Sequence, residues 1–121
     1  MRKLTVGMYA VFGAFAVLAG IAALISPALV TAEADHSGLV AHLIREEAAT
    51  FVFIGLMSFW CVRHFDGRRP VHGGFLVLTG LFAAIHWLGY FQGGAGLRSP
   101  LVNTVPFLLF VVTAPRESRA A

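Results

Sequence analysis

Residues 45–62 read REEAATFVFIGLMSFWCV: three charged side chains followed at once by a long apolar run. A run of this kind, from Ala48 to Val62, is typical of a buried helix. Two adjacent carboxylates, Glu46 and Glu47, are costly at the head of such a helix unless they face water or a partner. The composition of the rest of the chain indicates whether this helix is surrounded by protein or by lipid.

The composition indicates a membrane protein. Hydrophobic residues make up 58% of the 121 residues and charged residues only 12%, about half the charged share of a soluble domain. A soluble fold of this length needs a polar surface, and the chain has too few polar residues to make one. The hydrophobic residues also occur in blocks, with charges and prolines between them, which indicates several membrane crossings.

Four apolar blocks predict four transmembrane helices in one domain that covers residues 1–121. At 1.5 Å per residue, about 20 residues cross a hydrocarbon core of about 30 Å, and the first three blocks reach this length. The expected helices cover about 4–26, 38–63, 72–92 and 99–114. The expected fold class is therefore all-α, an integral membrane four-helix bundle.

The first and last helices carry features that bear on packing. Small residues recur at helical spacing along one face of the first helix, where a neighbouring helix can approach closely. They are Gly13, Ala16, Gly20 and Ala23.

The fourth helix is short and is interrupted by Pro106, which frees the carbonyl of Val102. A free carbonyl in a membrane needs a partner, so we expect this helix to be kinked against its neighbours.

The orientation follows from the Lys and Arg residues of alternate loops, which are more frequent on the cytoplasmic side. The other side holds only Arg45 and Arg98. The majority side holds Arg2, Lys3, Arg63, Arg68, Arg69, Arg116 and Arg119. We therefore expect both termini in the cytoplasm. Because these residues are scattered at block ends rather than clustered with aromatic residues on one face, no nucleic-acid partner is expected.

Two further features limit the possible chemistry and processing. Ala32-Glu33-Ala34 resembles a signal-peptide cleavage site. The apolar block before it is longer than the 7–15 residues of a signal-peptide core, so we expect the first helix to be retained. Cys61 is the single cysteine, which excludes an intramolecular disulfide and a dithiol mechanism within one chain.

Depth estimates bring polar residues of three helices to one layer in the outer half of the bundle. With the second helix centred near Val52, Glu46 and Glu47 lie roughly 8–9 Å outward of the midplane. With the third centred near Phe82, His86 lies roughly 6 Å outward. The candidate residues of this layer are Arg45, Glu46, Glu47, His86, Tyr90 and Asn103.

This layer has several interpretations. In the first, a carboxylate of Glu46 or Glu47 pairs with His86 or an arginine and only holds helices together. In the second, the layer anchors a small or lipid-like ligand in a pocket that opens outward. In the third, His42, Glu46 and His86 hold a metal ion. Proton transfer by a Glu–His pair is a further option. We predict no cofactor and no metal.

Other residues have simpler expected roles. His64 and His72 flank the basic turn, where we expect both rings to be solvated. Trp60, Trp87 and Tyr90 lie toward helix ends, where aromatic residues form belts at the membrane surface.

The layout resembles the small four-helix bacterial membrane proteins of the DoxX-like type. The shared features are a small-residue first helix, a periplasmic loop, an acidic head on the second helix and a short last helix. The resemblance implies a place in the bacterial inner membrane, among subunits and partners of membrane oxidoreductases. The cysteines of thiol-active relatives are absent, since Cys61 is alone. No functional residue is transferred.

The sequence thus predicts a multi-pass inner-membrane protein that is an accessory or scaffold component rather than an enzyme. Its expected partners are the lipid bilayer and other membrane subunits or a second copy of the chain. The alternative is a ligand-binding or carrier protein, or a small redox or proton-handling protein, that uses Glu46, Glu47, His86 and Tyr90.

Overall fold

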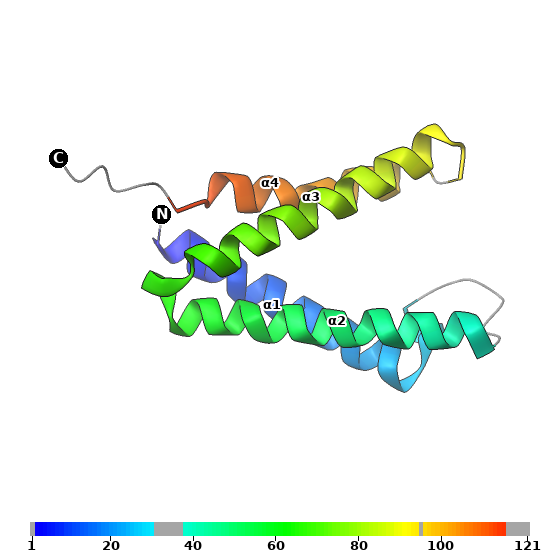
Figure 1. Ribbon diagram of the computed structural model, residues 1–121, viewed down its shortest axis with the longest axis horizontal. Coiled ribbons are helices and arrows are strands. Elements are labelled where there is room, and N and C mark those ends of the chain that lie inside the picture. Colours follow the sequence, from blue (N-terminus) through cyan, green and yellow to red (C-terminus); the bar gives the residue numbers. More distant parts are fainter. Residues whose placement is uncertain (1, 31–37, 95, 116–121) are drawn as a thin grey trace. The chain divides into compact units, whose positions relative to one another are not determined.

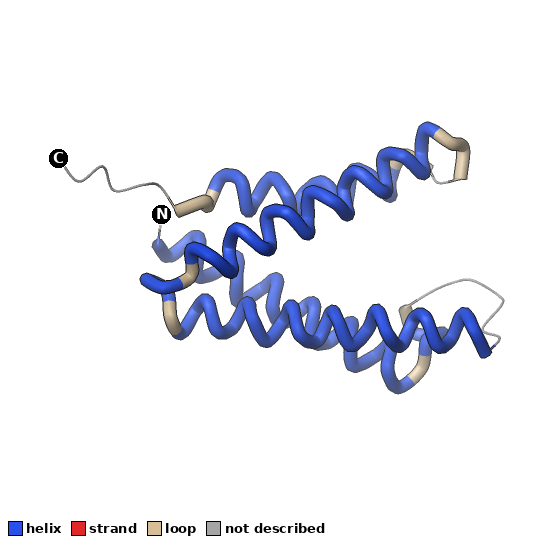
Figure 2. The backbone as a smooth tube through the Cα atoms, viewed as in Figure 1, coloured by secondary structure: helices blue, strands red, loops and turns tan. Residues whose placement is uncertain are grey.

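The computed structural model describes residues 2–30, 38–94 and 96–115. Within these ranges the chain is all-α, with four α-helices and no strand (Figure 2). The helices are α1 (Arg2–Ile25), α2 (Gly38–Arg63), α3 (Arg69–Phe91) and α4 (Arg98–Val112). The all-α class and the four helices are therefore confirmed, with each boundary within three residues of its expected position.

The chain divides into two compact units, each of which contains one helical hairpin (Figure 1). The first unit, 2–65, holds α1, the short 3₁₀ turn η1 (Pro27–Leu29) and α2. The second, from residue 66 onward, holds α3 and α4. The cleavage-like tripeptide Ala32-Glu33-Ala34 lies outside the described residues, as do Arg116 and Arg119 of the predicted cytoplasmic tail.

Small residues bring α1 and α2 into backbone contact. The buried residues of α1 are Thr5, Tyr9, Gly13, Ala16, Gly20 and Ala23, which include the whole predicted small-residue stripe. A methyl group on Gly20 would lie 2.8 Å from the carbonyl oxygen of Ala48, and one on Gly13 would lie 3.1 Å from that of Gly55. The predicted stripe is therefore the surface that packs against α2.

These close approaches fix the register of the hairpin. Gly13, at the middle of α1, lies against Gly55 and Ser58, and Gly20 lies between Ala48 and Val52. In this antiparallel register, the last turn of α1 is level with residues 45–47 of α2. The first two turns of α2, residues 38–44, therefore extend beyond the end of α1.

Aromatic rings and one glycine pack α3 against α4. A methyl group on Gly80 would lie 3.2 Å from the Phe107 ring, and the rings of Phe75 and Phe110 have centroids 5.3 Å apart. α4 continues through Pro106 as one helix. The predicted interruption does not end the helix, because a proline removes only one hydrogen bond of the ladder and its neighbours remain.

Two described helices, α1 and α3, are long and apolar enough to cross a membrane by length and composition. α2 is longer, but each 18-residue stretch of it includes at least three charged residues, because Arg45, Glu46 and Glu47 lie near its start and Arg63 at its end. α4 has 15 residues, and its length of about 22 Å is less than the hydrocarbon thickness of about 30 Å.

Candidate functional site

The charged head of α2 is exposed. Arg45, Glu46 and Glu47 all lie at the surface of the helix. The Nε2 atom of His42 lies 3.2 Å from Oε1 of Glu46, and these side chains are 67% and 64% exposed. Residues four apart in a helix share a face, so this pair forms within α2 without help from another helix.

The register of the α1–α2 hairpin gives a different reference level for the position of these carboxylates along α2. The sequence estimate centred α2 near Val52, whereas the middle of α1 packs against Gly55. Glu46 and Glu47 are then about 12–14 Å from the level of the hairpin's centre, at 1.5 Å per residue. Measured from this level they are further along α2 than when measured from Val52, because α2 extends beyond α1 by its first two turns.

His86 and Trp87 join α3 to α4 through side-chain hydrogen bonds. Nδ1 of His86 lies 2.8 Å from the hydroxyl oxygen of Ser99. The indole N–H of Trp87 donates to the hydroxyl of Thr104 at 3.0 Å, and that hydroxyl donates to the Pro100 carbonyl at 2.7 Å. Such bonds between helices satisfy polar groups that an apolar environment would leave without partners.

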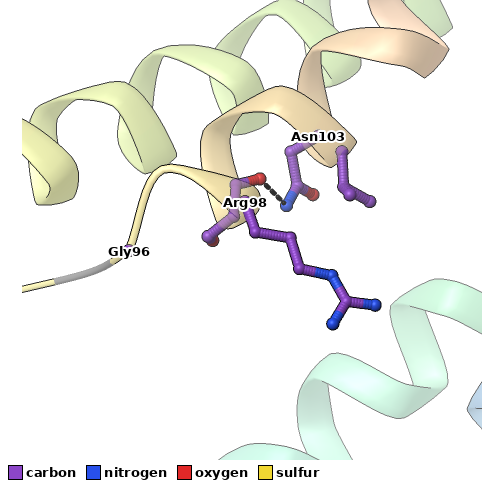
Figure 3. A pocket seen from close by; sticks show the side chains of 5 residues that line it. Gly96, Arg98 and Asn103 are labelled. Carbon is purple, nitrogen blue, oxygen red and sulfur yellow. Dashed lines mark hydrogen bonds between the residues drawn. The ribbon is translucent and has the colours of Figure 1, made fainter.

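Tyr90 and Asn103, the other two candidates on this hairpin, make local contacts. The Tyr90 ring lies 5.9 Å from the Trp87 ring and 5.5 Å from the Phe91 ring. The amide of Asn103 donates to the carbonyl of Ser99, on its own helix, at 2.9 Å (Figure 3). The cluster of aromatic rings at the end of α3 includes Trp87 and Tyr90 of the predicted belt. The Asn103 amide makes its hydrogen bond within α4.

An open depression lies at the start of α4. Its volume is about 400 Å³, and it is lined by Gly96, Arg98, Ser99, Val102 and Asn103 (Figure 3). Of the candidate residues, only Asn103 lines it. Ligand pockets usually enclose most of their ligand, and this shallow depression does not.

The candidate residues therefore belong to two separate groups. Arg45, Glu46 and Glu47 lie at the head of α2, and Glu46 contacts His42. His86 contacts Ser99 in the α3–α4 hairpin. The contact between a carboxylate and His86 would join the two hairpins and stays a prediction. Among the residues that the structure describes, no three His, Cys, Asp or Glu side chains gather as a metal site requires.

His72 is a polar core residue that the sequence interpretation placed wrongly. It is only 2% exposed, and its Nε2 atom lies 2.8 Å from the Phe110 carbonyl oxygen. That carbonyl lies in the last turn of α4, where the Ala114 amide bonds to Val111 instead. Since a carbonyl only accepts, Nε2 must carry the proton.

The position of His72 was visible in the periodicity. His72, Thr79 and Ala83 share the face of α3 that is buried, so the pattern favoured burial even though the basic turn is near. His64, on the other side of the turn, is exposed as expected and stacks on Trp60 with ring centroids 4.8 Å apart.

Neither a protein family, nor a curated protein, nor a solved structure matches the chain. The resemblance to DoxX-like proteins therefore stays a prediction from architecture. The function must be inferred from the residues and contacts of the two hairpins.

Proposed function

We propose that this chain is a multi-pass integral membrane protein, with both termini in the cytoplasm, and that it serves as a non-catalytic accessory or scaffold component of a membrane assembly. One observation carries the proposal: large apolar side chains are exposed on each of the four described helices. Phe15, Phe53, Ile85 and Leu108, one from each helix, are 64%, 61%, 62% and 53% exposed.

Lipid or other membrane helices are the covering that such surfaces fit. Soluble monomers rarely leave large contiguous apolar areas in water, because each square ångström costs free energy. Val11 and Leu18 extend the exposed surface of α1, and Leu81 and Leu88 that of α3. α1 and α3 also have the length and composition of membrane spans.

The register of the first hairpin explains how α2 can cross the membrane with its charges. If α1 spans the hydrocarbon, residues 45–47 lie level with its outer end, close to half of the bilayer thickness of about 30 Å. Arg63 lies at the other end of α2. The residues between, 48–62, are uncharged. The charges then lie at the two membrane surfaces, where long side chains reach water.

The shortness of α4 supports an accessory role in an assembly. A span of about 22 Å is too short for the bilayer, and short spans are accommodated by local thinning or by packing against other helices. Pro106 also deprives the Val102 carbonyl of its usual donor, and Val102 is 58% exposed. A neighbouring membrane helix that packs against α4 would accommodate its short span and would cover the region around Val102.

The polar residues support a structural rather than a catalytic role. His86, Trp87 and Asn103 are engaged in hydrogen bonds within the α3–α4 hairpin, and Glu46 is engaged with His42. The ligand-binding alternative has less support, since the depression beside Arg98 is shallow. An inner-membrane location and oxidoreductase partners, which the DoxX-like resemblance implies, form part of the proposal.

Membrane fractionation tests the proposal first. We expect the chain to stay in the membrane pellet after extraction at alkaline pH and to be released only by detergent. In a mild detergent, we expect a protein mass larger than one chain of 13.0 kDa. Release by alkali alone would contradict membrane insertion. A protein mass of one chain would contradict the assembly, and a bound chromophore or metal would favour the alternative.

A further inference from the structure

The open end of the α1–α2 hairpin collects its positive charge. α1 begins at Arg2 and α2 ends at Arg63, and the antiparallel register places these termini at the same end. The Arg2 guanidinium lies 5.0 Å from the centroid of the Phe65 ring, a cation–π contact that holds the start of α1 beside the end of α2. Lys3 and Arg63 are exposed.

The acidic residues of α2, Glu46 and Glu47, are at the opposite end of the helix. At the basic end, Asp66 directly follows Phe65, so one described carboxylate stands against the three positive charges of Arg2, Lys3 and Arg63. The hairpin is therefore electrically asymmetric along its axis, with Arg2, Lys3 and Arg63 at one end.

Apolar surface lies directly beside the exposed cations. Lys3, Gly7 and Val11 are four residues apart and share one face of α1. Val11 is 73% exposed, and nothing lies within 4 Å of the position that a methyl group on Gly7 would take. On α2, Phe59 and Arg63 share a face in the same way, and Phe59 is 41% exposed.

We propose that this basic end binds the phosphate headgroups of anionic phospholipids, with Lys3 and Arg63 as phosphate ligands. This inference rests on the proposed membrane function, and it names the class of lipid that the basic end would bind. The ammonium of Lys3 acts as a point charge, and the guanidinium of Arg63 can bind phosphate oxygens in pairs. The exposed faces below them, at Val11 and Phe59, take the acyl chains. Because a free phosphate ion would leave those faces uncovered, the arrangement favours a lipid.

The test compares lipids on the full-length chain purified in a neutral detergent. Bound phosphatidylglycerol and phosphatidylcholine are titrated and counted by native mass spectrometry. We expect tighter binding of phosphatidylglycerol, and we expect the double variant Lys3→Gln/Arg63→Gln to weaken it about 30-fold, from the usual contribution of two cations. The preference should also fall as salt is raised.

Matched controls separate this surface from charge in general. The double variant Arg45→Gln/Arg98→Gln removes the same charge and should keep the preference. Inorganic phosphate serves as a further probe. Equal binding of the two lipids, or a preference that survives Lys3→Gln/Arg63→Gln, would overturn the proposal. So would inorganic phosphate that competes as well as phosphatidylglycerol. If the chain stays in the alkaline-extracted membrane but shows no lipid preference, only this inference fails.

Discussion

Replacing Gly55 by alanine is expected to destabilise the α1–α2 hairpin by about 1–3 kcal/mol, the usual cost of overpacking a tight interface. The added methyl group would overlap the Val17 side chain and lie 2.8 Å from the Gly13 carbonyl oxygen and 3.0 Å from the Val17 nitrogen. Backbone atoms cannot rotate away as a flexible side chain can, so the two helices must move apart. Gly55→Leu should prevent the hairpin from closing.

The measurement is unfolding of the purified protein in detergent, followed by helical circular dichroism. Gly7→Ala is the matched control, because Gly7 also lies within a helix of this hairpin and has nothing within 4 Å of the added methyl position. That control should be neutral or stabilising by up to about 1 kcal/mol, since alanine favours helix. Equal stability of Gly55→Ala and Gly7→Ala would show that the close packing described for α1 and α2 is wrong.

The second large effect is expected at His72. His72→Leu fills a similar volume but leaves the Phe110 carbonyl without the donor that lies 2.8 Å away. A buried acceptor without a partner costs about 1–3 kcal/mol. His72→Gln places an amide N–H near the position of Nε2 and should recover part of the loss.

The same unfolding measurement checks this expectation. His64→Leu is the control, because His64 is exposed and substitutions at such positions usually change stability by less than about 0.5 kcal/mol. If His72→Leu is as stable as the wild-type protein, the hydrogen bond to Phe110 does not hold α3 and α4 together. If His72→Gln is no better than His72→Leu, the stabilisation comes from the shape of the ring and not from its donor.

Much of the fold could be predicted because the strongest signals are local. Apolar blocks and the Gly and Pro residues between them set the helix boundaries. The helical spacing of Gly13, Ala16, Gly20 and Ala23 identified the packed face of α1, because only small residues let two backbones approach. These features depend on a single segment at a time, so one sequence is enough to find them.

The register between helices could not be predicted, because it depends on which residue of one helix meets which residue of the next. The sequence gives no direct sign that Gly13 meets Gly55, and hence none that α2 extends beyond α1. The hydrogen-bond and ion-pair partners of the candidate residues could not be predicted for the same reason. His86 bonds to Ser99 and Glu46 to His42, choices that depth alone does not decide.

This register changes the meaning of the Arg45-Glu46-Glu47 stretch. The sequence placed the two carboxylates well inside the outer half of the bundle, where they needed His86 or an arginine. In the hairpin they are level with the last turn of α1, and Glu46 and His42 are largely exposed. We infer that they mark the outer surface of the membrane, where water solvates them. Charges at this level need no catalytic or binding role to be retained.

Labelling of single cysteines in right-side-out membrane vesicles tests this account most directly. Cys61→Ala first removes the native thiol, and Glu46→Cys, Phe53→Cys or His64→Cys is then added for reaction with a membrane-impermeant maleimide. We predict labelling at position 46 from outside, labelling at position 64 only after the vesicles are opened, and none at position 53. Phe53 is 61% exposed in the structure, so the fold alone cannot protect it. Labelling at position 53 as fast as at position 46 would contradict the account, because α2 would then lie in water.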